Sequence, residues 1–197
     1  MPKQILVFLT LLFLGASPGL AEDNRETDRR ALLKVMHDIE QGINAPDIEL
    51  MARQFDEKAV ITWLNAEISQ GPDGVRDYFK RMVGNAQGTV LSKYVTHPKI
   101  SGPAVFYGDV AVASGTTLDE FTPHERSVFK FDSRWTATLR KSDGQWKIVA
   151  LHLSTNTFNN VLLTELRQLA YTFAVGGVVA GLLAAGAWRL WRRRQHA

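Results

Sequence analysis

His152 has the side chain best suited to chemistry in this sequence, and it lies in a segment, Gln145 to Ser154, that predicts a β-strand. Its imidazole could act as a general base or donate a hydrogen bond to a ligand, because histidine titrates near neutral pH. The alternative is a structural histidine bonded within the core, since buried polar groups are usually satisfied internally. His152 is the best candidate for a catalytic residue, and no catalytic set can be assigned around it.

Four further side chains complete the predicted ligand pocket. Trp63 and Trp135 could line it and stack on a flat ligand, and the hydroxyl of Tyr78 could reach it from a predicted helix. Ser154 follows His152 at the spacing that places both on one face of a strand. The alternative for the aromatic residues is an ordinary core position, because large rings dominate protein cores.

The composition argues against several other kinds of site. The chain has no cysteine, and its five histidines lack metal-site spacing, so we expect neither a metal nor another cofactor. The net charge of +3 does not indicate nucleic-acid binding, because residues 22–168 hold all 20 acidic residues but only 18 of the 23 basic ones.

The last two predicted strands can be paired in detail. Asp143-Gly144 between them favours a two-residue type I′ turn. This turn places Leu139 opposite Ile148 and, if the ladder continues without interruption, Trp135 opposite His152. The Trp135 and His152 rings are therefore predicted to face the same side of the sheet.

The order of the predicted elements indicates the fold class. Apolar residues at helical spacing predict three helices, over 22–42, 47–55 and 72–83. Alternating and β-branched residues predict strands over 59–64, 89–100, 109–121, 126–140 and 145–154. Helices followed by an antiparallel sheet with one apolar face indicate an α+β fold. We expect three N-terminal helices packed on a strongly curved antiparallel sheet, forming a cone with a pocket.

Four segments resemble the nuclear transport factor 2-like superfamily, also called SnoaL-like or ketosteroid-isomerase-like. They are INAPDIELMARQFDEKAV (43–60), GPDGVRDYF (71–79), GDVAVASG (108–115) and RWTATLRKSDGQWKIVALHLS (134–154). The resemblance covers about residues 31–156, which is most of the part between the two apolar ends. It implies a curved sheet wrapped by three helices, a mostly apolar pocket and frequent dimers through the outer face of the sheet.

The resemblance leaves the activity open. Some relatives are isomerases, cyclases or dehydratases, and others bind or assemble without catalysis, so the fold does not decide the function. Steroid isomerases of the superfamily use an aspartate base and a tyrosine. Their positions match Thr62 or its neighbour and Ile39, which cannot transfer a proton in that reaction.

The N-terminal residues 1–21 resemble a secretory signal peptide. Lys3 precedes an apolar stretch of signal length, and small residues at positions 19 and 21 suit cleavage after Ala21. The alternative is an uncleaved membrane anchor. The domain would then occupy residues 22–156 and lie outside the cytoplasm.

A C-terminal transmembrane helix is predicted over residues 169–188, which contain no charge and match the thickness of a bilayer core. Residues 157–168 form a juxtamembrane linker, and 189–197 a basic tail that the positive-inside rule places in the cytoplasm. The alternative is a buried soluble helix. Gly177, Gly181 and Ala185 have the spacing of a helix-dimerisation motif, although small residues are common in such helices.

These expectations combine into one functional hypothesis. The protein is expected to be a single-pass protein of the bacterial inner membrane, with its domain in the periplasm or outside the cell, and to form a homodimer. The domain would bind a small apolar molecule or a protein partner without catalysis. The alternative is an isomerase, dehydratase or cyclase that uses His152 as its acid–base group.

Overall fold

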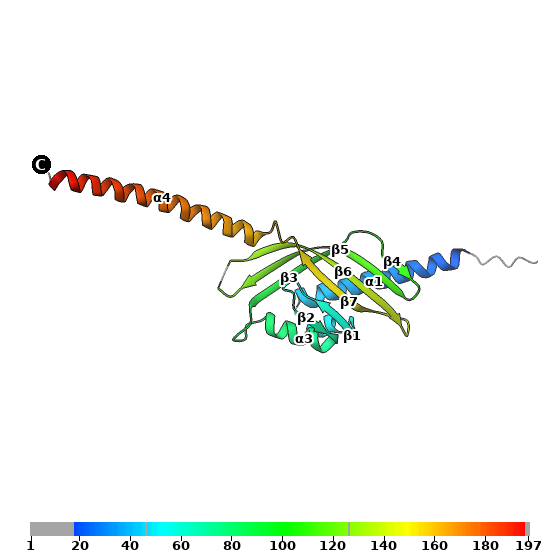
Figure 1. The fold of residues 1–197 in the computed structure, drawn as a ribbon. Helices are drawn as coiled ribbons and strands as arrows, with labels where there is room; N and C mark the ends of the chain where they lie inside the picture. Colours follow the sequence, from blue (N-terminus) through cyan, green and yellow to red (C-terminus); the bar gives the residue numbers. More distant parts are fainter. Residues whose placement is uncertain (1–17, 46, 126, 196–197) are drawn as a thin grey trace, which may run out of the picture.

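The computed structural model describes residues 18–45, 47–125 and 127–195. They form four helices and seven strands in an α+β arrangement, which confirms the predicted fold class (Figure 1). The helices are α1 (Pro18–Asn44), α2 (Ile48–Ala52), α3 (Gly71–Met82) and α4 (Val161–Gln195). The strands are β1 (Phe55–Thr62), β2 (Ile68–Gln70), β3 (Leu91–Ile100), β4 (Val105–Tyr107), β5 (Val110–Pro123), β6 (Phe129–Ser142) and β7 (Gln145–Thr155).

The strands form one sheet in the order β2-β1-β7-β6-β5-β3, with β4 also paired to β5. Every pair is antiparallel except β1 with β7, which run parallel. The prediction of a purely antiparallel sheet is therefore wrong in this detail, because the first strand of the chain pairs with the last. The three-residue strands β2 and β4 were not predicted, since segments of that length carry almost no periodic signal.

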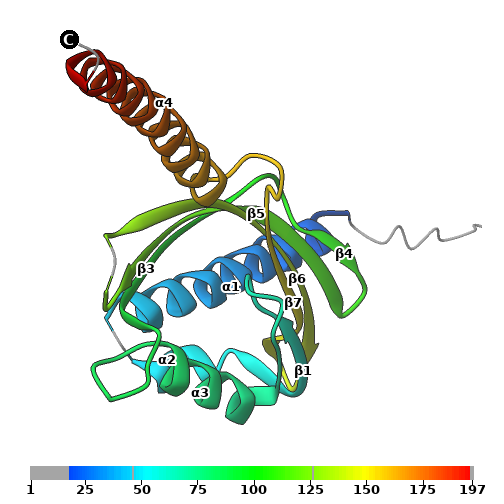
Figure 2. The ribbon, with the colours of Figure 1, turned by 60° about the vertical axis from the view of Figure 1, so that its left-hand side comes forward.

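The sheet curves around α1, which crosses its concave side, while α2 and α3 lie at one end (Figure 2). Leu32 and Val35 of α1 are buried against the sheet, as the helical spacing predicts. The end of α1 is fixed to β3 by two bonds: Asn44 Nδ2 donates to Thr96 O at 2.8 Å, and Thr96 N donates to Asn44 Oδ1 at 2.9 Å. The three predicted N-terminal helices thus close the curved sheet as expected.

Asp28 connects the first half of α1 to the β6–β7 hairpin through hydrogen bonds. Its buried carboxylate accepts hydrogen bonds from Lys141 Nζ at 2.8 Å and from Trp146 Nε1 at 2.9 Å. Burial alone would raise the pKa of Asp28, but the hydrogen bonds from Lys141 and Trp146 outweigh it, and the pKa lies below its usual value. The contact therefore requires an ionised carboxylate.

The β6–β7 hairpin begins as predicted. Asp143 and Gly144 have positive φ values of 52° and 75°, as a type I′ turn requires, and Leu139 pairs with Ile148. The register shifts directly after this pair, because Thr138 pairs with Ala150 and leaves Val149 as the extra residue of a β-bulge.

The bulge overturns the predicted pairing of Trp135 with His152. Trp135 pairs with Leu153, and His152 pairs with Thr136 on the other face. The order of apolar residues in β7 gives the physical reason. Trp146 and Ile148 alternate with more exposed residues at one parity of the sequence, and Leu151 and Leu153 alternate at the other parity. The extra residue lets all four side chains face the concave side.

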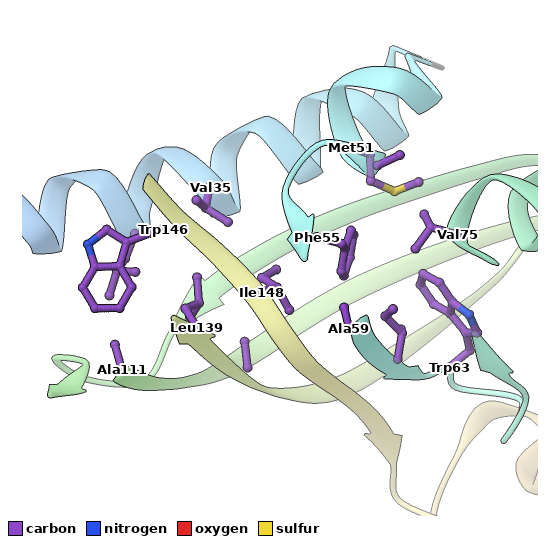
Figure 3. Close-up of a cluster of buried hydrophobic side chains, with 14 of the residues drawn as sticks. Val35, Met51, Phe55, Ala59, Trp63, Val75, Ala111, Leu139, Trp146 and Ile148 are labelled. Carbon is purple, nitrogen blue, oxygen red and sulfur yellow. The ribbon is translucent and has the colours of Figure 1, made fainter. Parts of the chain in front are cut away.

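The hydrophobic core lies between the helices α1, α2 and α3 and the concave face of the sheet (Figure 3). Val35 lies there near Leu139 and Ile148, and Phe55 and Trp63 lie toward the end that α2 and α3 cover. Met51, Ile61 and Val75 are the largest fully buried apolar side chains. The core therefore runs along the whole inner surface of the cone.

The C-terminal helix α4 leaves the domain and extends away from it (Figure 1). It begins at Val161, inside the predicted linker, and continues through the predicted span into the basic tail. None of its described residues is buried, and it is long and apolar enough to cross a membrane. Residues 1–17 of the predicted signal peptide lie outside the described residues, so the signal peptide, its cleavage and the domain boundaries stay predictions.

Candidate functional site

A cavity of about 200 Å³ lies between α1 and the concave face of the sheet. Its walls are mostly aliphatic and aromatic side chains from α1, β3, β5, β6 and β7. Leu33, Ile100 and the loop residues 102–104 also line it. Among the described lining residues, side-chain oxygen or nitrogen atoms come only from Arg29, Tyr94, Thr96, Thr117 and the two tryptophans.

Trp63 lines the cavity as predicted. Its ring stacks on Tyr78, with 4.3 Å between centroids and an interplanar angle of 6°, and its Nε1 donates to Ser69 Oγ at 2.7 Å. Tyr78 lies behind Trp63 and is not among the lining residues. Burial, with a contribution from Glu67, raises the pKa of Tyr78 to about 12, so its phenol stays neutral at physiological pH.

Trp135 also lines the cavity, and its position depends on a glycine in the neighbouring strand. Gly115 of β5 pairs with Trp135 of β6. A Cβ atom on Gly115 would lie 2.5 Å from Trp135 Cζ2, so the indole occupies the space that any other residue would fill. Trp135 Nε1 donates to Thr116 O at 3.1 Å. The indole therefore contributes its apolar rings to the cavity.

His152 and Ser154 do not lie in the cavity, and the prediction that they face it is wrong. Both side chains are exposed on the outer face of the sheet, where His152 pairs with Thr136 and Ser154 with Arg134. Leu151 and Leu153 occupy the inner positions instead. The cause is the bulge at Val149, which exchanges the faces of all following residues of β7.

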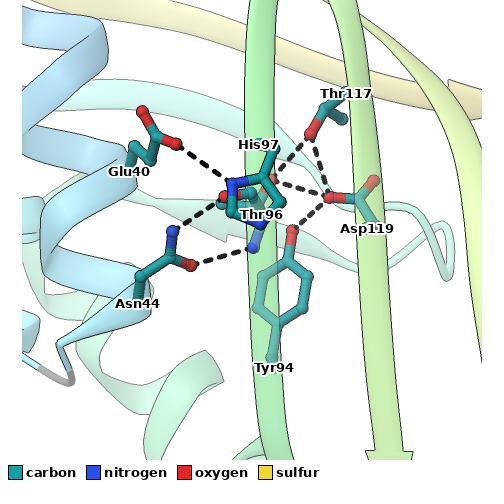
Figure 4. A network of polar contacts seen from close by, with 7 residues as sticks. All are labelled: Glu40, Asn44, Tyr94, Thr96, His97, Thr117 and Asp119. Atoms are coloured by element: carbon teal, nitrogen blue, oxygen red, sulfur yellow. Dashed lines mark hydrogen bonds and ion pairs between the residues drawn. The ribbon is translucent and has the colours of Figure 1, made fainter. Parts of the chain in front are cut away.

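A buried polar network at one part of the cavity wall was missed by sequence reasoning (Figure 4). Asp119 of β5 is fully buried, and its Oδ1 accepts from Tyr94 Oη at 2.9 Å and from Thr96 Oγ1 at 2.8 Å. Thr117 Oγ1 lies 3.2 Å from the same oxygen and 2.7 Å from Thr96 Oγ1. Tyr94, Thr96 and Thr117 line the cavity, so the carboxylate lies directly behind its wall.

Two buried side-chain atoms beside or within this network lack partners. Asp119 Oδ2 and Ser133 Oγ are buried and have no hydrogen bond within the part of the chain that the structure describes. Ser133 pairs with Thr117 across the β5–β6 ladder, and Phe131, two residues earlier, pairs with Asp119. The two unpartnered atoms therefore belong to side chains that are diagonal neighbours on the inner face.

Burial, reinforced by the nearby Asp119 carboxylate, raises the pKa of Tyr94 well above its usual value. The Tyr94 phenol therefore keeps its proton and remains a donor to Asp119. A sequence signal for this network exists: Tyr94 and Thr96 alternate in one predicted strand, and Thr117 and Asp119 alternate in the next. Polar residues at period two on an otherwise apolar face indicate a buried polar group.

The predicted helix-dimerisation residues lie on α4. Gly177, Gly181 and Ala185 are exposed along this helix, and nothing lies within 4 Å of a Cβ built on either glycine. Such space suits the close approach of a second helix. Dimerisation through this surface stays a prediction.

Comparison with known proteins identifies the fold. A family model described as a SnoaL-like domain matches residues 24–152. No curated protein sequence shows significant similarity to the chain. Among solved structures, a hexachlorocyclohexane dehydrochlorinase from Novosphingobium barchaimii is similar at 17% identity, with a TM-score of 0.60 over 71% of this chain and 94% of the other.

Two further structures show the same fold. A proposed scytalone dehydratase from Novosphingobium aromaticivorans is 21% identical, with a TM-score of 0.59 over 69% of this chain and 89% of the other. A nuclear transport factor 2-like protein from Salmonella enterica is 18% identical, with a TM-score of 0.54 over 69% of this chain and 96% of the other. At these identities the likeness concerns the fold and not the activity.

Proposed function

The chain belongs to the SnoaL-like domain family, and we propose that it is a membrane-anchored, non-catalytic protein that binds a small apolar molecule in its cavity. One observation carries this proposal: an open cavity of about 200 Å³ whose described walls are almost entirely apolar. Transfer of apolar surface from water into such a site contributes about 0.8 kcal/mol for each buried methylene group. A ligand of matching size therefore needs no charged contact to bind.

Tyr94 is the one side chain of acid–base type in the described cavity wall, and burial raises the pKa of its phenol well above the usual value, which supports binding without catalysis. No histidine, aspartate or glutamate is among the described residues that line the cavity. General acid–base chemistry requires such a group within hydrogen-bond reach of the substrate. The alternative, an isomerase, dehydratase or cyclase with His152 as its acid–base group, is not favoured, because His152 lies on the outer face.

The C-terminal helix supports the membrane anchor. It is apolar over the length of a bilayer core and ends in Arg192, Arg193 and Arg194. Basic residues stay on the cytoplasmic side of such helices, so the domain lies on the opposite side, as the predicted signal peptide also requires. The domain is then close to a lipid phase into which apolar ligands partition.

The proposal is tested with full-length protein in lipid nanodiscs, with empty nanodiscs as the blank, because detergent could occupy the cavity. The probe is 2-methylnaphthalene, a flat apolar molecule, and its binding is followed by its fluorescence. Ala113→Phe fills the cavity, because Ala113 lines it. We expect this variant to lower probe affinity at least about tenfold.

The matched control is Ala150→Phe, which makes the same change at an exposed position on the outer face. We expect the control to bind the probe as the wild type does. Thermal unfolding of both variants verifies that they are folded. Equal probe affinity in the Ala113→Phe variant and the wild type would disprove binding in this cavity.

A further inference from the structure

The cavity opens beside the N-terminal half of α1. Among its described lining residues, the exposed ones are Leu33, Ile100, Gly102 and Pro103, while the others are buried or half-buried. These four residues mark the mouth of the cavity, because solvent reaches its wall there. The mouth therefore lies between α1 and the connection from β3 to β4, and β4 lies beside the N-terminal half of α1 (Figure 2).

Arg29 is located at this mouth. It is a half-buried lining residue and lies one helical turn before Leu33 on the same side of α1. Its Cζ is 5.8 Å from the centroid of the Phe106 ring in β4. Phe106 packs against the same core as the lining residue Ala104, two positions earlier. The guanidinium group therefore lies beside the mouth, at the end of a flexible stem that can bring it to a bound molecule.

The charge of Arg29 has no acidic partner. An arginine stays protonated at every physiological pH, and no ion pair or hydrogen bond within the described ranges of the chain involves Arg29. Arg25 lies over the same Phe106 ring at 4.7 Å, but its charge is compensated by Asp28 at 3.6 Å. No acidic side chain is among the described lining residues either. The mouth of an apolar cavity thus carries one uncompensated positive charge.

From this arrangement we infer that the cavity selects an apolar molecule that carries one anionic group, such as a carboxylate, and places that group at Arg29. The inference rests on the proposed function and specifies its ligand class. The apolar body of the ligand would lie inside, while its anion at the mouth stays partly hydrated, so the ion pair avoids the high cost of burying two charges. A guanidinium group also binds a carboxylate through two parallel hydrogen bonds.

The size of the cavity restricts the source of this anion. Pockets for drug-sized ligands have volumes of about 300–1,000 Å³, whereas this cavity has about 200 Å³. A two-chain phospholipid is too large for it. The expected ligand is therefore a small single molecule with a compact apolar body and not a lipid of the bilayer.

The experiment compares three naphthalenes of similar shape at neutral pH, in nanodiscs of zwitterionic phosphatidylcholine. 2-Naphthoate carries an anion, 2-naphthamide is its uncharged isostere, and 2-methylnaphthalene has no polar group. For the wild type we expect 2-naphthoate to bind about tenfold more tightly than 2-naphthamide, after subtraction of binding to empty nanodiscs. Equal affinities for these two probes in the wild type would overturn the inference.

Arg29→Gln tests the origin of this preference. Glutamine keeps a polar end but removes the charge, so the ratio of the two affinities should fall to about one. Arg30→Gln is the matched control, because Arg30 is exposed, does not line the cavity and pairs with Glu26 at 3.9 Å. This control should keep the wild-type ratio. An unchanged ratio in a folded Arg29→Gln variant would contradict the inference.

Salt dependence in the wild type provides a second test if Arg29→Gln does not fold. Raising the ionic strength from about 0.01 M to about 1 M shortens the Debye length from about 30 Å to about 3 Å. We expect 2-naphthoate to lose affinity several-fold while 2-naphthamide does not. A constant ratio of the two affinities over this range would also overturn the inference. Failure of the proposed function gives a different result, because 2-methylnaphthalene would then not bind to the wild type either.

Discussion

The indole ring of Trp135 lies in the space beside the Cα atom of Gly115, where any other residue would carry its Cβ. A Cβ atom at Gly115 would lie 2.5 Å from Trp135 Cζ2 and 2.0 Å from the carbonyl oxygen of Lys99, a backbone atom that cannot rotate away. This contact holds an aromatic wall of the cavity in place. It also makes a single glycine a determinant of the site, although Gly115 has no side chain to contact a ligand.

Replacement of Gly115 by alanine should therefore destabilise the domain by about 1–3 kcal/mol, the usual cost of overpacking a filled site. The indole must move, so the tryptophan emission spectrum should shift and probe affinity should fall. Chemical denaturation measures the change in free energy of unfolding. Gly102→Ala is the control for stability alone, because nothing lies within 4 Å of a Cβ at that position, whereas Gly102 itself lines the cavity. Equal stability of both variants would show that the close approach is absent in solution.

The bulge at Val149 predicts opposite results for two adjacent residues. Leu153→Ala removes a lining side chain. It should lower the free energy of unfolding by at least about 1 kcal/mol and should also lower probe affinity. His152→Ala alters only an exposed residue, so the free energy of unfolding should stay within about 0.5 kcal/mol of the wild type. Denaturation and probe titration of both variants decide between the two registers. A larger loss of stability for His152→Ala than for Leu153→Ala would support the uninterrupted register and contradict the structure.

Asp28 should make stability depend on pH in the acid range. Its pKa in the folded domain lies below the usual 3.8, so its contribution is complete above that value and is lost as the pH falls toward the folded-state pKa. We expect Asp28→Asn to lower the free energy of unfolding at pH 7 by about 1–3 kcal/mol. The difference from the wild type should shrink below pH 3.8.

Urea denaturation at pH 7 and at pH 3 measures this change. Asp77→Asn is the control, because Asp77 is exposed on α3. If the free energies of unfolding of the wild type and Asp28→Asn differ by the same amount at both pH values, the charge of Asp28 does not contribute to stability.

The predicted association of α4 can be tested in the membrane. Leucine at both Gly177 and Gly181 prevents the close approach of two helices, so chemical cross-linking in nanodiscs should give several-fold less dimer than the wild type. Gly176→Leu changes a neighbouring glycine on a different side of the helix and should leave cross-linking unchanged. Equal dimer in the wild type and the double variant would exclude this helix surface as a dimer interface.

Much of the architecture could be predicted from the sequence, because it depends on long periodic segments. The helix around Leu32 and Val35, the five longer strands and the turn at Asp143 all follow from spacing and turn chemistry. The parallel pairing of β1 with β7 could not be predicted, because no local pattern specifies which distant strand is a neighbour.

The candidate site was predicted less well, for two separate reasons. Trp63 and Trp135 were placed correctly in the cavity, whereas a single inserted residue, Val149, moved His152 to the outer face. A bulge changes every later side chain on its strand, so one missed residue reverses several assignments. Asp119 was missed because the alternation of Thr117 with Asp119 indicates a buried polar group but does not identify its partners, Tyr94 and Thr96, which lie on another strand.

The parallel pairing of β1 with β7 has a consequence for the order of events during biosynthesis. Strands β1 and β2 join the sheet through β7, the last strand to be made. Until that strand emerges, β1, which carries the buried Ile61, lacks its partner in the main sheet, and long-range closure of this kind is slow. Closure of this part of the sheet therefore waits for the final strand, which α4 follows after a short connection.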